Sequence, residues 1–192
     1  MSPARNPQPS SNYLPRIVDP GSPSRLLLKF ARDFSKDCPV LDLGCGSGRN
    51  AIALARMGLT VVGVDRDRQR IDQLKAFAMP CDLPAAVVPV WAELGLASWP
   101  FGPRCLSAVV CVHFLDLALI SLMNASLIRG GHLYIETVGG QGQNHLELPR
   151  AGELLELLSP RFRFEYYEER PVGPRRSRKR AVKLLAKKVK AF

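Results

Sequence analysis

Three glycines at every second position follow an apolar strand pattern in the first third of the chain. They are Gly44, Gly46 and Gly48, and they come directly after residues 40–43, VLDL. Glycine allows the backbone to approach a ligand closely, and the first turn of a following helix offers N–H groups to it. This segment therefore predicts a nucleotide-type binding site where a strand turns into a helix.

A second apolar strand, residues 60–64, is followed by Asp65. An acid about 20 residues beyond the glycine turn is placed to accept hydrogen bonds from ribose hydroxyls. The last glycine of the dinucleotide fingerprint G-x-G-x-x-G would fall on Arg49, so this chain does not match that pattern. The carboxylate of Asp42 would repel a pyrophosphate, and it suits a ligand with a cationic end, such as the ammonium and sulfonium of S-adenosylmethionine.

With these residues the sequence resembles the class I S-adenosylmethionine-dependent methyltransferases. The resemblance rests on VLDLGCGSGRNAIALARMG at 40–58 and VVGVDRD at 61–67, and it covers roughly residues 22–190. Within that superfamily the chain is most similar to small bacterial stand-alone methyltransferases related to tellurite-resistance methyltransferases, through runs such as CVHFLD at 111–116 and GGHLYIETV at 130–138. The resemblance implies S-adenosylmethionine as the cofactor.

Strand and helix patterns alternate along the chain, which predicts an α/β fold with a doubly wound, mostly parallel sheet of the Rossmann-like type. The expected strands are residues 40–43, 60–64, 86–90, 108–112, 132–138, 162–168 and 181–189. The expected helices are residues 25–34, 50–57, 68–77, a segment after Asp116, and 151–158. The last two strands are too close in sequence for a crossover helix, so the last one is expected to be antiparallel. The resemblance also implies a seven-stranded sheet of this kind.

In such sheets, ligands bind beyond the carboxyl ends of the strands. This rule, together with the resemblance, nominates a set of cofactor-binding residues. They are Asp42, Gly44, Cys45, Gly46, Asn50, Asp65, Arg66, Glu93, Val112 and His113. The resemblance implies an acid near Glu93 that bonds the adenine amino group, and the alternative is an ordinary solvated loop acid. The same rule brings Glu136 and Thr137 to this edge.

His113 is the candidate catalytic residue, because it follows four apolar residues at a carboxyl strand end. A histidine with a pKa near neutrality can take a proton from an attacking hydroxyl, thiol or amine. The alternative is a histidine that only shapes the cofactor pocket, since methyl transfer needs no base when the nucleophile is already ionised.

The chain of 192 residues is 46% hydrophobic, which suits one domain with a single core. Residues 1–24 are rich in proline and are expected to form a mobile arm, and residues 25–192 the methyltransferase domain. Five cysteines without C-x-x-C spacing indicate reduced thiols in a cytoplasmic protein and predict no metal site. The N-terminus shows no secretory signal, and no stretch is typical of a membrane span.

The net charge of +10 is concentrated in the tail, because residues 170–192 hold ten basic residues and no acid. Within it, the turn 175–180 would form a positive rim near the site, able to steer an anionic substrate or a nucleic acid. Basic nucleic-acid sites usually contain aromatic residues, and residues 170–191 contain none. The sequence therefore favours an anionic small molecule, or a solvated charge run.

Four functions remain open at this point. The first is methyl transfer from S-adenosylmethionine to a small, anionic or neutral acceptor. The second is an RNA methyltransferase that holds phosphates with the turn 175–180. The third is a cofactor-binding protein without turnover, and the last is a dinucleotide oxidoreductase with a degenerate fingerprint.

Overall fold

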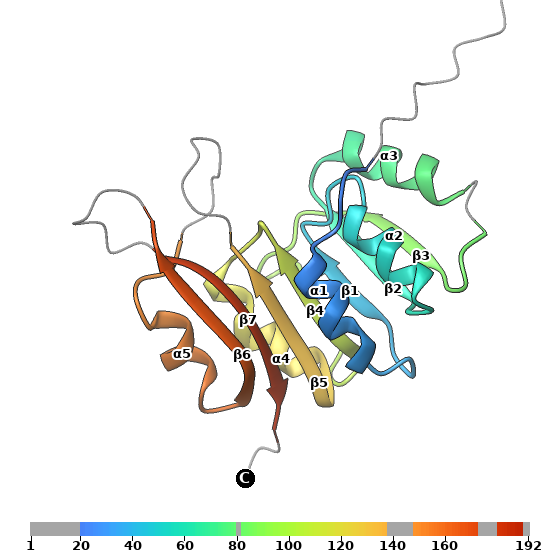
Figure 1. The fold of residues 1–192 in the computed structure, drawn as a ribbon. Coiled ribbons are helices and arrows are strands. Elements are labelled where there is room, and N and C mark those ends of the chain that lie inside the picture. Colours follow the sequence, from blue (N-terminus) through green and yellow to red (C-terminus); the bar gives the residue numbers. More distant parts are fainter. Residues whose placement is uncertain (1–19, 80–81, 138–147, 173–179, 190–192) are drawn as a thin grey trace, which may run out of the picture.

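The computed structural model describes residues 20–79, 82–137, 148–172 and 180–189. Its seven strands form one sheet in the order β3-β2-β1-β4-β5-β7-β6 (Figure 1). The strands are β1 (Val40–Leu43), β2 (Val61–Asp65), β3 (Val87–Trp91), β4 (Leu106–Val112), β5 (Leu127–Glu136), β6 (Phe162–Pro171) and β7 (Arg180–Lys188). The first five strands pair in parallel, and β7 runs antiparallel to both of its neighbours. The predicted doubly wound sheet with an antiparallel last strand is confirmed.

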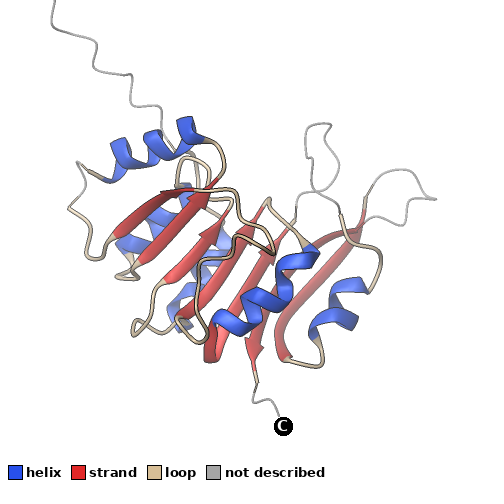
Figure 2. Ribbon diagram, turned by 180° about the vertical axis from the view of Figure 1, so that it is seen from behind, coloured by secondary structure: helices blue, strands red, loops and turns tan. Residues whose placement is uncertain are grey.

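The helices cover both faces of this sheet. They are α1 (Arg25–Phe30), α2 (Arg49–Arg56), α3 (Arg68–Ala78), α4 (Ile120–Ser126) and α5 (Glu153–Leu158), with short 3-10 turns η1 (Ala31–Asp33) and η2 (Leu117–Leu119). Helices α1 and α2 lie on one face, and α4 and α5 lie on the other, which the view from behind shows in front of the strands (Figure 2). Helix α3 extends the α1–α2 layer, since it shares a buried cluster with α2.

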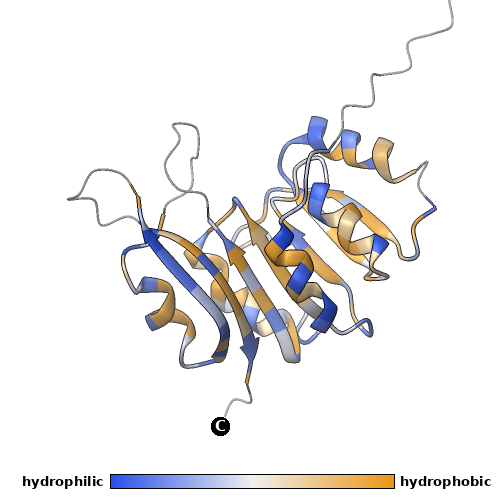
Figure 3. Ribbon diagram, viewed as in Figure 1, coloured by the Kyte–Doolittle hydropathy of each residue, from blue (hydrophilic) through white to orange (hydrophobic). Residues whose placement is uncertain are grey.

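The core lies on both sides of the two central strands. Every residue of β1 and β4 is buried, and these strands read as nearly continuous apolar runs, as strands covered on both faces must (Figure 3). Asp42 and Ser107 are the polar exceptions in these two strands. A buried carboxylate in the central strand is costly, so Asp42 is the residue whose presence packing alone does not explain.

Two boundaries differ most from the sequence-based expectation. Strand β5 begins at Leu127, directly after α4, and not at His132, which follows Gly130 and Gly131. The register with β4 shifts there, so the two glycines lie inside an irregular part of the strand, where Gly130 has a φ of +74°. The helix predicted over 25–34 ends as the 3-10 turn η1 after Phe30. Ser24 caps α1, because its Oγ accepts a hydrogen bond from the N–H of Leu27.

Several expectations fall outside the described residues. These are residues 1–19 of the proposed arm and residues 175–179 of the basic turn. Within the part of the chain that the structure describes, none of the helices has both the length and the hydropathy needed to cross a membrane.

Candidate active site

The glycine turn joins β1 to α2 and is fastened to β2. The N–H groups of Gly44 and Cys45 both donate to the carbonyl of Val64, at 2.9 and 3.0 Å. All three turn glycines have positive φ, and Gly48, at +88°, also has α3 packed against it. A Cβ on Gly48 would lie 2.1 Å from Cδ1 of Leu74, so only glycine allows the turn and α3 to come this close.

Asp65 ends β2 and faces this turn. Its Oδ2 accepts a hydrogen bond from the N–H of Gly46 at 2.8 Å, and its Oδ1 accepts one from the N–H of Asp67 at 2.9 Å. A carboxylate has about four acceptor positions, so Asp65 retains capacity for further donors. The structure therefore brings together the two features that the sequence reasoning paired, the glycine turn and the strand-end acid.

Asp42 lies beneath the turn and is 1% exposed. Burial raises the pKa of Asp42 to about 7, against the lowering effects of the Arg49 guanidinium and of a hydrogen bond from the backbone N–H of Ala51. Its Oδ2 is buried without a hydrogen-bond partner. A buried acceptor of this kind costs free energy unless a donor or a cation reaches it, so Asp42 marks a place where a cationic ligand group is favoured.

Arg49 opens helix α2 and was not among the predicted site residues. Its Nη2 lies 3.4 Å from Nδ1 of His113, and its Nη1 lies 3.4 Å from the carbonyl oxygen of Ser22. In the sequence pattern, Arg49 only occupies the position of the missing third glycine. The signal that could have identified it is a guanidinium at the first helical position, next to a turn that is suited to a charged ligand.

His113 follows β4 with a φ of +61°, a conformation that is uncommon for a side-chain-bearing residue. Its N–H donates to the carbonyl of Glu136 at 2.8 Å, which fixes the backbone at this point. Burial lowers the pKa of the His113 imidazole, and the nearby cations Arg49 and Lys183 lower it further, against the opposing effect of Glu136. The imidazole is therefore neutral at pH 7 and able to accept a proton.

Glu136 connects several segments at the same edge. Its carboxylate accepts hydrogen bonds from Ser24 Oγ at 2.5 Å and Tyr134 Oη at 2.7 Å, and it pairs with Lys183 Nζ at 3.0 Å. The strand-end rule brought Glu136 to this edge, but nothing in the local sequence indicated these partners.

The remaining predicted cofactor residues divide into buried and exposed ones. Asn50 is buried and its Oδ1 accepts the N–H of Ser24 at 3.0 Å, while Cys45 and Val112 are also buried. Arg66 and Glu93 lie together beyond β2 and β3 with 3.8 Å between Nη1 and Oε1, but their side chains are 71% and 79% exposed. They form a solvated rim beside the glycine turn.

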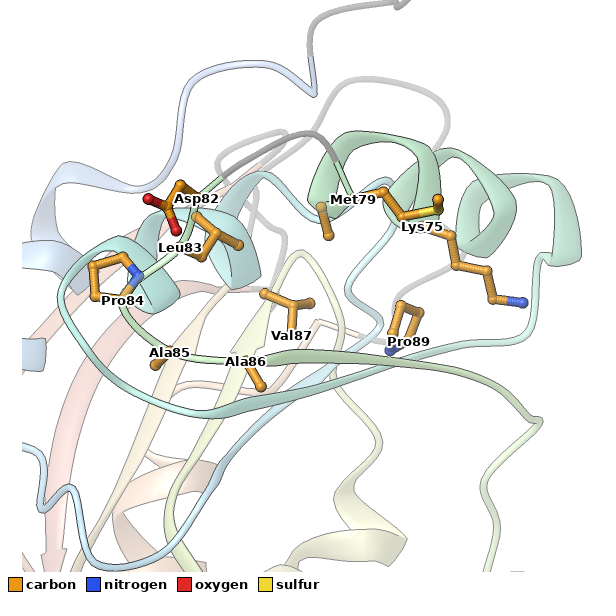
Figure 4. A pocket seen from close by; sticks show the side chains of 10 residues that line it. Lys75, Met79, Asp82, Leu83, Pro84, Ala85, Ala86, Val87 and Pro89 are labelled. Carbon is orange, nitrogen blue, oxygen red and sulfur yellow. The ribbon is translucent and has the colours of Figure 1, made fainter.

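An open surface pocket of about 620 Å³ lies away from these residues, between α3 and β3. Lys75 of α3 and Met79 at the C-cap of that helix line it on one side, and Val87 and Pro89 of β3 line it on the other (Figure 4). It contains none of the predicted site residues, and we attach no chemistry to it. Among the described residues, no three His, Cys, Asp or Glu side chains gather as a metal site would require.

Comparisons with known proteins agree with this geometry. Residues 40–131 match the family model described as a methyltransferase domain. The chain is 32% identical over 162 residues to the ribosomal protein L11 methyltransferase of Thermus thermophilus, a match that covers 73% of this chain and 62% of that protein. It is 33% identical over 104 residues to a ubiquinone biosynthesis O-methyltransferase of Rhizobium rhizogenes, covering 52% and 40%. The matches thus span about half the length of these curated relatives.

Solved structures show the same fold. A SAM-dependent methyltransferase from Methanosarcina mazei superposes with a TM-score of 0.64 at 19% identity, covering 88% of this chain and 99% of that one. TehB from Haemophilus influenzae gives a TM-score of 0.64 at 21% identity, covering 84% and 61%. The matches to the methyltransferase-domain model and to the ribosomal protein L11 methyltransferase support assignment of the chain to the class I S-adenosylmethionine-dependent methyltransferase superfamily, and the solved structures show that it has the same fold.

Proposed function

We propose that this protein is an enzyme that transfers a methyl group from S-adenosylmethionine to a small-molecule acceptor. The observation that carries the proposal is the buried Asp42 carboxylate with its unpartnered Oδ2, directly beneath the glycine turn. A cationic ligand end satisfies that oxygen, whereas the pyrophosphate of a dinucleotide would be repelled by it.

The residues at this edge fit the chemical groups of S-adenosylmethionine. Asp65, with spare acceptor capacity at the end of β2, is suited to the ribose hydroxyls. Asp42 favours the ammonium and sulfonium, and the guanidinium of Arg49 offers a partner for the carboxylate of the methionine moiety. When bound, the cofactor supplies an electrophilic methyl group, and the protein has to align it with a nucleophile and exclude water.

His113 is the proposed proton acceptor on the opposite side of the site. Its imidazole is neutral at pH 7, because its pKa is lowered by burial and by Arg49 and Lys183. A neutral imidazole can take the proton from a hydroxyl, thiol or amine as the methyl group arrives. Arg49, whose guanidinium lies 3.4 Å from the His113 ring, adds positive charge at this point, which also favours an acceptor with a negative charge.

RNA is a weaker candidate acceptor. Two of the described basic residues near this edge already have acidic partners: Arg180 pairs with Glu169 at 3.2 Å and Lys183 with Glu136 at 3.0 Å. Relatives and structural neighbours include enzymes named for ribosomal protein, ubiquinone biosynthesis and tRNA. Similarity to these enzymes therefore does not identify the acceptor class of this protein.

The test is transfer of a labelled methyl group from S-adenosylmethionine to three pools: small carboxylates, phenols, amines and thiols; total RNA; and protein. We expect label in the small-molecule pool. Label only in RNA or protein would contradict the proposed acceptor class. Cofactor binding without transfer to any pool would favour a binding protein without turnover.

A further inference from the structure

The Glu136 carboxylate has more donors around it than Asp42 or Asp65. Its side chain is 12% exposed, and three donors from three segments converge on it: Ser24, Tyr134 and Lys183. Burial by itself would raise the pKa of Glu136, but these hydrogen bonds and the Lys183 charge hold it below its usual range. The carboxylate is therefore ionised and a poor base at pH 7.

The backbone of Glu136 holds His113 as well. Glu136 is the partner of Val112 in the parallel β4–β5 pairing, and its carbonyl accepts the N–H of His113 one residue further on. A histidine at a φ of +61° keeps that conformation only when its surroundings hold it. The carbonyl group of Glu136 thus fixes the backbone of His113, and the carboxylate of Glu136 contributes to the electrostatic surroundings of the His113 ring.

Ser24 links Glu136 to the first residues of the described chain through hydrogen bonds. Its Oγ donates to Glu136, its N–H donates to Asn50 at the start of α2, and its Oγ caps α1. Ser22, two residues earlier, accepts from Arg49. Residues 20–24 are therefore held against the first turn of α2 and the end of β5.

A second tyrosine–glutamate pair in the same sheet provides an internal comparison. On β6, Tyr166 Oη donates to Glu168 at 2.6 Å, and Glu168, like Glu136, is in register with Lys183. Glu168 has Arg170 as its ion-pair partner, and among the described residues it forms no hydrogen bond with Ser24 or His113. The two strands thus share the local tyrosine–glutamate pair, and of these two pairs the one on β5 is connected to the site.

We propose that Glu136 is a positioning residue of the active site, which holds residues 20–24 and His113 in place on the acceptor side of the cofactor. This inference rests on the proposed function for the identity of the site. The contacts themselves do not depend on that function, so the two can fail separately.

The test compares Glu136→Gln with Glu168→Gln in the full chain, by amide hydrogen exchange and by NMR titration of the His113 ring. In Glu136→Gln we expect amide exchange at residues 24–28 to speed up by about tenfold, as the loss of hydrogen bonds to a charged group predicts. We also expect the pKa of His113 to fall further, because the carboxylate that raises it is gone. Glu168→Gln should change neither quantity.

Ser24→Ala and Ser24→Thr test the Ser24 contact of Glu136 separately from its contact with His113. Ser24→Ala should reproduce the faster exchange, and Ser24→Thr, which keeps the hydroxyl, should restore slow exchange. Equal effects of Glu136→Gln and Glu168→Gln, or unchanged exchange in both Glu136→Gln and Ser24→Ala, would overturn the inference. Calorimetry with S-adenosylhomocysteine on the same samples reports on the proposed function independently, since a protein that fails to bind it can still show the expected exchange pattern.

Discussion

The edge of the sheet at the carboxyl ends of the strands has two halves, and each contains one notable carboxylate. The two carboxylates differ in whether their oxygens have hydrogen-bond partners. Asp42, in the half formed by β1 and β2, is buried with one oxygen unpartnered and with its pKa raised to about 7. Glu136, in the half formed by β4, β5 and β7, has three donors, and its pKa is lowered. An unsatisfied buried group is costly without a ligand, whereas a satisfied one stabilises the structure around it. We therefore propose that the first half binds the ligand and that the second half positions the residues around it.

The largest effect is expected in the acceptor half. His113→Gln should lower turnover on a hydroxyl or amine acceptor by about 10²-fold or more, the usual range for loss of a general base. S-adenosylhomocysteine affinity should change by less than about threefold, because the glycine turn is untouched. Steady-state rates and calorimetry on the same sample check both statements. Unchanged turnover would make His113 a residue that only shapes the pocket.

The cofactor half is tested by Asp65→Ala. We expect S-adenosylhomocysteine affinity to fall by about 10²-fold, because hydrogen bonds to a charged acceptor contribute about 1.5–3 kcal/mol each. Asp72→Ala is the matched control, an exposed acid on α3 that pairs only with neighbours on the same helix. If both variants bind alike, Asp65 is not a ligand of the ribose.

The raised pKa of Asp42 predicts a pH dependence of about tenfold. A cation near Asp42 favours its ionised form, so ligand binding is strongest above the free-protein pKa of about 7 and weakens as the pH falls below it. Between pH 8 and pH 6 the affinity for S-adenosylhomocysteine should therefore fall about tenfold, since a shift of one pH unit below the pKa leaves about a tenth of the group ionised. In Asp42→Asn this decline should disappear, and its persistence would assign it to another group.

The smallest effect is expected on the exposed rim. Arg66→Ala should change S-adenosylhomocysteine affinity by less than about threefold, because its ion pair with Glu93 is solvent-exposed and such pairs contribute little. A loss of tenfold or more by calorimetry would show that the Arg66 side chain binds the cofactor directly.

The first half of the site could be predicted from the sequence because its determinants are local. The glycine turn and Asp65 are recognisable from spacing along neighbouring strands, and the parallel sheet brings them together. The second half could not, because Ser24 and Glu136 are 112 residues apart, and Arg49 and His113 are 64 apart. Only the strand order places such pairs in contact. The start of β5 was also mispredicted, since an irregular register leaves no periodic signal.

The most direct measurement is a calorimetric titration of the purified protein with S-adenosylhomocysteine at pH 8. This product contains the ribose and the amino acid end that the glycine turn, Asp65 and Asp42 are proposed to hold, and it needs no acceptor. Saturable binding at a single site is the predicted result. No binding at high micromolar ligand would contradict the account, because the unpartnered carboxylate of Asp42 would then have no ligand to explain it.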